Sequence, residues 1–179
     1  MKYLYVFDTA GAEATDLGGT YVQVALGGEQ ILPSFVTKKE RNLVANVALG
    51  ANFPLNTLVT LGAGIDVEPL RGKTVIEGAE NYHKRYAFSG FLLPGFNLSS
   101  SQQVYGKLGY SGLCLEHNGA NKRFHGPLFG LGYKQIINPD SSGWYTNAET
   151  NYVKYRTNNA NESVKKTELL LGLGYRFAF

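Results

Sequence analysis

The sequence predicts an all-β protein, an eight-stranded antiparallel up-and-down transmembrane β-barrel. Composition is the first reason: the 179 residues include 22 Gly, 12 Tyr and 10 Phe, charged residues amount to only 17%, and the net charge is +3. That profile excludes a disordered chain. The second reason is that no apolar run reaches the 18 or more residues of a membrane-spanning helix. The third is a recurrent alternation of large apolar with small or polar residues, which is typical of strands.

This alternation appears in eight successive segments. They are residues 20–28, 42–53, 57–68, 83–97, 103–116, 123–137, 143–157 and 167–179. Residues 1–18 precede the first segment, lack the long apolar core of a signal peptide, and are assigned to a leader of unclear role. The barrel itself is predicted to span residues 19–179.

The first three segments each place apolar side chains on one face. These faces are Val22, Val24 and Leu26 in the first, Leu43, Ala45, Val47, Leu49 and Phe53 in the second, and Val59, Leu61, Ala63, Ile65 and Val67 in the third. The fourth is strand-like, although Pro94 weakens its register because proline donates no ladder hydrogen bond.

The last four segments follow the same rule with more aromatic residues. Their apolar faces are Val104, Leu108 and Tyr110 in the fifth, Phe129, Leu131 and Tyr133 in the sixth, and Leu169, Leu171, Leu173, Tyr175, Phe177 and Phe179 in the eighth. The seventh segment has Trp144 near one end and Tyr155 near the other. In the eighth, Glu168 and Arg176 fall on the opposite face, so the two faces differ sharply in polarity.

The connections alternate in length. Short turns are predicted near residues 54–56, 99–101 and 139–142, and longer polar links at 29–41, 69–83, 117–122 and 158–166. This is the layout of an outer-membrane barrel, with short turns on the periplasmic side and longer loops outside. Both chain ends then fall on the short-turn side.

Polar residues of the strands collect on the smaller face and are predicted to fill the barrel interior. They are Gln23, Asn46, Asp66, Glu68, Lys107, Lys134, Glu149, Glu168 and Arg176. Four acids and three bases can pair, which offsets the cost of burying charge. The inverted, water-soluble arrangement would force some thirty large apolar side chains into a lumen that eight strands make too narrow for them.

Aromatic residues near strand ends are interpreted as interfacial girdles. They are Tyr21, Tyr86, Tyr105, Trp144, Tyr145 and Tyr155. The end of the chain, with Tyr175, Phe177 and Phe179 in alternation, resembles the C-terminal signature that the barrel assembly machinery recognises.

The final GLGYRFAF, the repeated Gly-Leu-Gly-Tyr at 130–133 and 172–175, and the opening GGTYVQVALG resemble small outer-membrane barrels of the OmpA/OmpX and Opa-like type. The resemblance covers residues 19–179. It implies a multi-pass protein of a Gram-negative outer membrane. It says little about function, because that group includes adhesins, serum-resistance factors and structural proteins.

No catalytic, cofactor or metal site is predicted. Lipid deacylases of this shape have a His and a Ser two residues apart, and none of His83, His117 and His125 has a Ser at that spacing, so no nucleophile is activated. His117, His125 and Glu116 could together form a weak surface metal site. The histidines are instead interpreted as rim or loop residues without such a role. Cys114 is the single cysteine, which excludes an internal disulfide; it is interpreted as a small apolar residue.

Basic residues gather in or beside the four longer links. They are Lys38, Lys39, Arg41, Arg71, Lys73, Lys84, Arg85, Lys122, Arg123, Lys154, Arg156, Lys165 and Lys166. Such a rim attracts polyanions generally. The expected partners are therefore outer-membrane lipids and lipopolysaccharide, a host polyanion or a host surface protein, and no nucleic acid.

The function that follows is non-enzymatic: a monomeric cell-surface barrel with a structural, adhesive or immune-evasion role through basic extracellular loops. Two alternatives stay open at this point. One is a narrow solute pore. The other is a soluble lipocalin-like carrier of a small apolar ligand, although the Gly-x-Trp and C-terminal helix of that fold are missing from the sequence.

Overall fold

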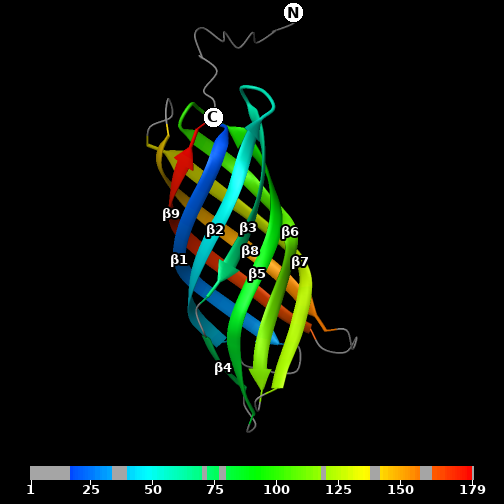
Figure 1. Ribbon diagram of the computed structural model, residues 1–179. Coiled ribbons are helices and arrows are strands. Elements are labelled where there is room, and N and C mark those ends of the chain that lie inside the picture. Colours follow the sequence, from blue (N-terminus) through cyan, green and yellow to red (C-terminus); the bar gives the residue numbers. More distant parts are fainter. Residues whose placement is uncertain are drawn as a thin grey trace, which may run out of the picture.

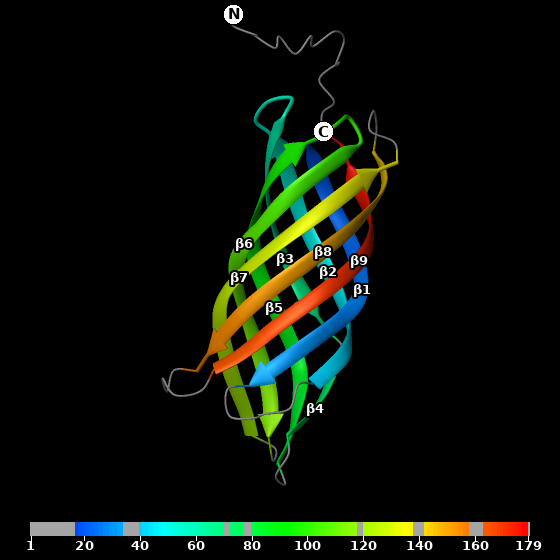
Figure 2. The same ribbon diagram turned by 180° about the vertical axis from the view of Figure 1, so that it is seen from behind.

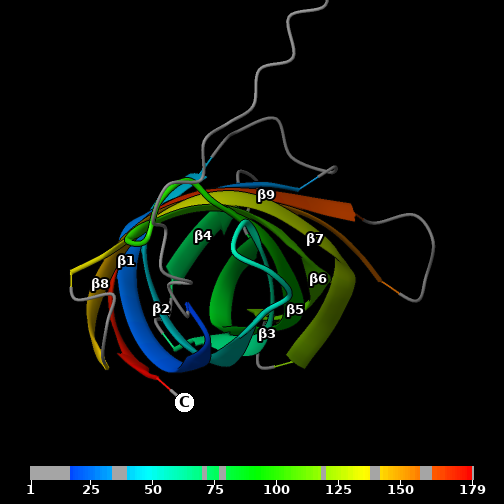
Figure 3. The ribbon, with the colours of Figure 1, turned by 90° about the horizontal axis from the view of Figure 1, so that it is seen from above.

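The computed structural model describes residues 17–33, 40–69, 72–76, 80–117, 120–137, 142–157 and 163–178. Nine antiparallel strands form one closed barrel, seen from the side in Figure 1 and along its axis in Figure 3. They are β1 (Gly19–Pro33), β2 (Glu40–Pro54), β3 (Val59–Glu68), β4 (Gly72–Ile76), β5 (Glu80–Asn97), β6 (Gln102–His117), β7 (Ala120–Ile136), β8 (Gly143–Arg156) and β9 (Ser163–Phe177). No helix in the described part of the chain is long and apolar enough to cross a membrane.

The nine strands make eight barrel positions, because β3 and β4 are successive parts of one. Both pair with β5: β3 lies along Ala87–Phe96, and β4 continues along Glu80–Lys84. Pairing of β1 with β9 and of β3 with β5 leaves no open side in the sheet order. The prediction of a closed eight-stranded antiparallel up-and-down barrel is confirmed.

Strand β1 begins at Gly19 and strand β9 ends at Phe177, at the same end of the barrel. We call this the terminal end and the opposite one the far end (Figure 1). A tight turn at the terminal end joins β2 to β3. There the Asn56 side chain accepts hydrogen bonds from the backbone N–H groups of Leu58 and Val59, at 2.8 and 2.7 Å, a turn-stabilising use of asparagine.

The predicted longer links at the far end were wrong in extent. Residues 29–33, 40–41, 72–76, 80–83, 117, 120–122 and 163–166 of these links are strand, and β4 lies wholly inside the second link. These strand extensions were missed because the regular alternation of apolar with polar residues is lost where a strand leaves the apolar zone.

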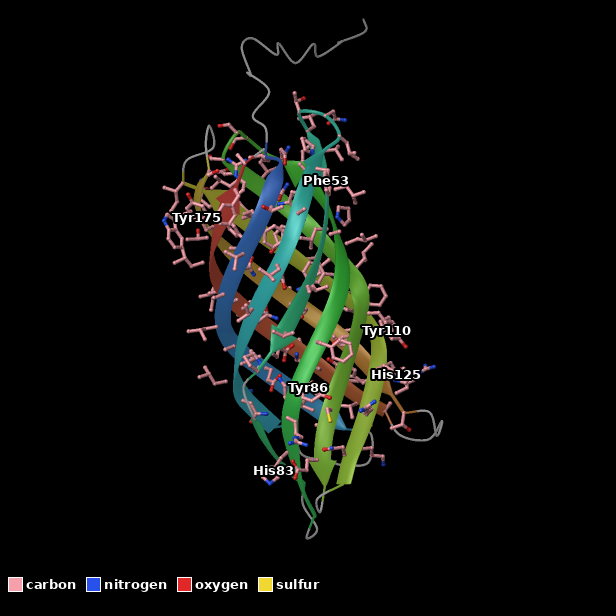
Figure 4. All side chains as sticks on the ribbon, viewed as in Figure 1. Phe53, His83, Tyr86, Tyr110, His125 and Tyr175 are labelled. Carbon is pink, nitrogen blue, oxygen red and sulfur yellow. The ribbon has the colours of Figure 1, made fainter. Side chains whose placement is uncertain are left out.

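The outer face of the barrel is apolar. Leu43, Leu131 and Leu171 expose 71%, 69% and 66% of their surface, the reverse of a water-soluble protein. Figure 4 shows Phe53, Tyr86, Tyr110 and Tyr175 projecting from the wall. An apolar exterior rules against the soluble lipocalin-like carrier, whose apolar residues would line the interior.

The two Gly-Leu-Gly-Tyr motifs fit side chains from neighbouring strands. The second glycine of each, Gly132 or Gly174, lies beneath the ring of Tyr105 or Tyr145, and an added Cβ would overlap that ring. The first glycine of each motif faces the side-chain amide of an asparagine on β8. The repeat therefore provides room for large polar side chains inside a narrow barrel.

The girdle prediction was wrong for four of its six residues. Tyr86 and Trp144 face outward, but four tyrosines are buried in the interior: Tyr21, Tyr105, Tyr145 and Tyr155. Each shares its strand face with an interior polar residue; Tyr21, for example, lies two residues from Gln23. A tyrosine suits either setting, because its ring is apolar and its hydroxyl needs a partner.

Candidate functional site: the sealed interior and the basic outer wall

All nine residues predicted to form the interior polar network are buried inside the barrel. The structure adds three charged residues that the sequence reasoning placed in links, namely Glu29, Lys84 and Lys166. Within the described residues the buried charges are therefore five acids and five bases. Acids and bases are thus present in equal numbers, which lowers the cost of removing them from water.

Lys84 and Lys166 were predicted to be basic loop residues, and this was wrong. Both side chains are about 1% exposed and lie in a cluster with Glu29, Glu68 and Glu168, which we call the glutamate–lysine cluster. Lys84 Nζ lies 2.6 Å from Glu29 Oε2 and 2.5 Å from Glu68 Oε2. Lys166 Nζ contacts Glu68 Oε1 and lies 2.6 Å from Glu168 Oε2.

A second cluster surrounds Lys107. Its Nζ donates hydrogen bonds to Asp66 Oδ2 at 2.8 Å and to Glu149 Oε1 at 2.9 Å. Glu149 also accepts hydrogen bonds from Tyr105 at 2.9 Å and from Asn151 at 2.6 Å. Asn151 in turn donates to Glu168 at 2.8 Å and so links the two clusters. Charged groups held by several partners are costly to remove singly.

Lys134 is held differently. Its ammonium group lies 5.1, 5.6 and 4.9 Å from the ring centroids of Tyr21, Tyr105 and Tyr145, an aromatic cage built by cation–π contacts. Tyr145 also donates a hydrogen bond to Gln23 at 3.2 Å.

The terminal end of the lumen is closed by packing. Leu17 is 2% exposed, and Arg176 donates a hydrogen bond to the carbonyl of Gly18 at 3.2 Å. A void lined by Leu17, Lys134 and Arg176 is too small for a water molecule. Residues 1–16 of the predicted leader lie outside the described residues.

The acidic side chains of the glutamate–lysine cluster lie close together. Three carboxylates, those of Glu29, Glu68 and Glu168, have oxygen atoms within 4.8 Å of one another, an arrangement that in other settings holds a metal ion. Here the ammonium groups of Lys84 and Lys166 each bridge two of these carboxylates. Two ammonium groups therefore already lie among the three carboxylates.

His125 lies apart from the other two residues of the weak metal site. Its backbone pairs with Gly112, four positions along the hairpin from the pairing of Glu116 with Asn121. Glu116 instead forms an ion pair with Arg85 at 3.4 Å. In Figure 4, His83 and His125 lie on the outside of the barrel.

Of the remaining predicted basic residues, Arg41, Arg85, Arg123 and Lys165 lie on the outer wall near the far end, and Lys122 is half-buried near the Phe124 ring. Lys38, Lys39 and Arg71 and the side chain of Lys73 lie outside the described residues.

Of the C-terminal signature, Tyr175 and Phe177 stack edge to face with centroids 4.9 Å apart, and Phe179 lies outside the described residues.

Five basic side chains gather where β7, β8 and β9 reach the far end. We call them the basic patch: Arg123, His125, Lys154, Arg156 and Lys165. Lys154 is directly opposite Lys165, and His125 is opposite Arg156. No acidic residue lies among the outward-facing described residues at these three strand ends. Lys154 and Lys165 are therefore directly opposed like charges, an arrangement that destabilises a sheet.

Comparison with known proteins gives a consistent result. The family model described as the outer membrane protein beta-barrel domain matches residues 6–177. No curated protein matches the sequence. Among solved structures, Ail, the attachment invasion locus protein of Yersinia pestis, in complex with the heparin analogue sucrose octasulfate, has a TM-score of 0.64 at 15% identity, covering 89% of this chain and 99% of that one.

Two further structures share the architecture. Neisserial surface protein A has a TM-score of 0.59 at 15% identity, covering 89% of this chain and 97% of that one. The outer membrane protein OprG of Pseudomonas aeruginosa has a TM-score of 0.52 at 12% identity, covering 90% and 97%. At such identities the likeness shows the fold alone.

Proposed function

Because this chain belongs to the outer membrane protein β-barrel domain family and so resides in the bacterial outer membrane, we propose that it is a non-enzymatic surface protein that binds polyanions through its basic patch. The role that follows is structural, adhesive or immune-evading. By the layout of such barrels the terminal end is periplasmic and the far end is extracellular.

The observation that carries this proposal is the basic patch itself. Lys154 and Lys165 face each other across β8 and β9 in the extracellular half, with Arg156 beside them. A sulfated or phosphorylated polymer would relieve their mutual repulsion and gain charge-assisted hydrogen bonds. Ail, a structural neighbour, was crystallised with a heparin analogue, which makes a sulfated polysaccharide the first candidate.

The patch can be tested with the full chain refolded in phosphatidylcholine vesicles and passed over immobilised heparin. We expect the double variant Lys154→Gln/Lys165→Gln to elute at lower salt than the unchanged protein, because salt screens exposed charge contacts. The matched control Arg41→Gln/Arg85→Gln removes the same charge elsewhere on the outer wall. Equal elution of both doubles would show that net charge alone governs binding, and the patch would be rejected.

The terminal strand supports a second, more general proposal. The alternation of apolar residues in β9 ends in the edge-to-face pair of Tyr175 and Phe177 on the outer wall. We propose that this strand is what the barrel assembly machinery recognises, and that the folded protein is a monomer.

A further inference from the structure

His125 differs from the other four members of the basic patch in the kind of charge that it carries. Arginine and lysine side chains stay positively charged near neutral pH, whereas the charge of an imidazole ordinarily changes between about pH 5 and pH 8. The side chain of His125 is exposed at the far end of β7. The basic patch therefore combines four fixed positive charges with one that depends on pH.

Strand pairing places His125 among the fixed charges. Its backbone is directly opposite Arg156 on β8, Lys154 lies two residues from Arg156, and Arg123 lies two residues before His125 on β7. Figure 2 shows the far ends of β7, β8 and β9 next to one another on the left of the barrel. Opposite residues of paired strands lie about 5 Å apart and alternate residues of one strand about 7 Å apart. One anionic polymer can therefore contact all four side chains.

On its other side His125 faces β6. Gly112 is directly opposite His125, and Tyr110 and Cys114 lie two residues away from Gly112 on either side. The imidazole and the Tyr110 ring have centroids 6.1 Å apart and planes inclined by 34°, and both side chains project from the wall in Figure 4. This ring contact keeps the imidazole on the outer surface beside the patch.

No carboxylate of the described residues lies next to His125. At the far end, the outward-facing described residues of β7, β8 and β9 include no acid, and the one acidic residue of β6 is Glu116. Glu116 pairs with Asn121, four positions along the hairpin from His125, and forms an ion pair with Arg85. A positive charge on His125 is therefore matched best by an anion from outside the protein.

We propose that polyanion binding at the basic patch is coupled to protonation of His125, so that the patch binds sulfated polymers more tightly in mildly acidic surroundings. This inference rests on the proposed function and adds a regulation to the same site. The sulfate groups stay ionised throughout this pH range, so the change of charge comes from the protein. By thermodynamic linkage, the bound polymer favours the protonated imidazole by the same factor as protonation favours the polymer.

The test measures the affinity of heparin for the full chain refolded in phosphatidylcholine vesicles, at about pH 8 and about pH 5.5 and at one ionic strength. We expect the unchanged protein to bind about threefold to fivefold more tightly at the lower pH, the gain that one exposed charge contact provides. His125→Gln should lose this gain and keep the weaker binding. His125→Arg, with a permanent charge, should bind at both pH values as tightly as the unchanged protein binds at the lower one.

His83→Gln is the matched control. His83 also lies on the outside of the barrel, on β5 and away from the basic patch (Figure 4), so this variant should keep the full pH dependence. Calorimetry in two buffers of different ionisation enthalpy gives an independent readout, the number of protons taken up when heparin binds. That uptake should fall in His125→Gln and stay unchanged in His83→Gln, and a shift of gel mobility on heating shows that each variant is folded.

The proposal is overturned if the affinity of the unchanged protein does not depend on pH, or if His125→Gln keeps the dependence. An equal loss with His83→Gln also overturns it, because imidazole charge anywhere on the wall would then suffice. The proposed function is read separately at about pH 8 from Lys154→Gln/Lys165→Gln. Failure of that variant to weaken binding more than its control rejects the patch and the coupling together, whereas binding that depends on the patch but not on pH rejects the coupling alone.

Discussion

Lys107 and Lys134 are both buried cations in one lumen, yet their removal should cost very different amounts of folding free energy. Lys107 bridges Asp66 and Glu149, so Lys107→Met leaves two carboxylates without a counterion and should cost about 3–5 kcal/mol of folding free energy. Lys134 rests on tyrosine rings. Lys134→Met removes a buried charge without orphaning a carboxylate and should cost less than about 1 kcal/mol. Urea unfolding in lipid vesicles measures both.

The exposed Lys165→Met is the control for losing one lysine. A cost for Lys107→Met no larger than for this surface variant would contradict the role given to the bridging ion pairs. A cost for Lys134→Met equal to that for Lys107→Met would show that the aromatic cage stabilises its cation as strongly as two carboxylates do.

Which residues face inward could be predicted wherever the alternation is unbroken. Lys166 shares a face with Glu168 and could have been placed inside by the same count that placed Glu168. Lys84 could not, because the register shifts between Lys84 and Tyr86. A β-bulge there inserts one residue, so counting back from the outward-facing Phe88 puts Lys84 on the wrong side.

At the scale of single strands, the outer face should tolerate charge only near its edges. Leu131 lies midway along the apolar face of β7, and Leu43 is the last apolar residue of β2 before Arg41. Leu131→Lys should cost about 2–4 kcal/mol and Leu43→Lys about 0–1 kcal/mol, because the penalty falls toward the interface. Vesicle unfolding titrations give both values. Equal penalties would mean that the apolar face is not embedded as its length suggests.

Neighbouring strands pack closely because Gly132 and Gly174 leave room for the rings of Tyr105 and Tyr145. Gly132→Val should push Tyr105 away from Glu149 and cost about 1–3 kcal/mol through overpacking. The control is Gly90→Val, whose side chain enters open space on the outer wall and should leave stability almost unchanged. Equilibrium unfolding measures the stability of the two variants. A Gly132→Val protein as stable as Gly90→Val would contradict the packing described.

The sequence could reveal the strands but not their full length. Alternation located all eight barrel positions, since the apolar zone demands it on every strand. It ended near Glu29 and Lys84, because beyond them apolar and polar residues no longer alternate regularly along the strand. The repeated Gly-Leu-Gly-Tyr pointed to a family, but its structural use depended on β8 asparagines and on tyrosines of β6 and β8, which only the strand pairing brings together.

At the scale of the whole barrel, the interior ion pairs decide between a sealed body and a narrow pore. Hydrogen bonds run from Lys107 and Tyr105 to Glu149, through Asn151 to Glu168, and on through Lys166 to Glu68. An ion crossing the lumen would have to break these contacts in a low-dielectric space, at several kcal/mol for each charge displaced. We therefore expect no steady conductance from the unchanged protein in planar bilayers.

The same argument says how conductance could be created. Tyr105→Ala/Tyr145→Ala removes two large rings from the lumen and uncovers the space above Gly132 and Gly174, so ions should pass at a small but measurable rate. Tyr110→Ala/Tyr133→Ala removes the same mass from the outer wall and should stay silent. Single-channel recording distinguishes them: steady currents from the unchanged protein would support the pore, whereas currents only from the interior variant would show that its tyrosines and ion pairs close the barrel.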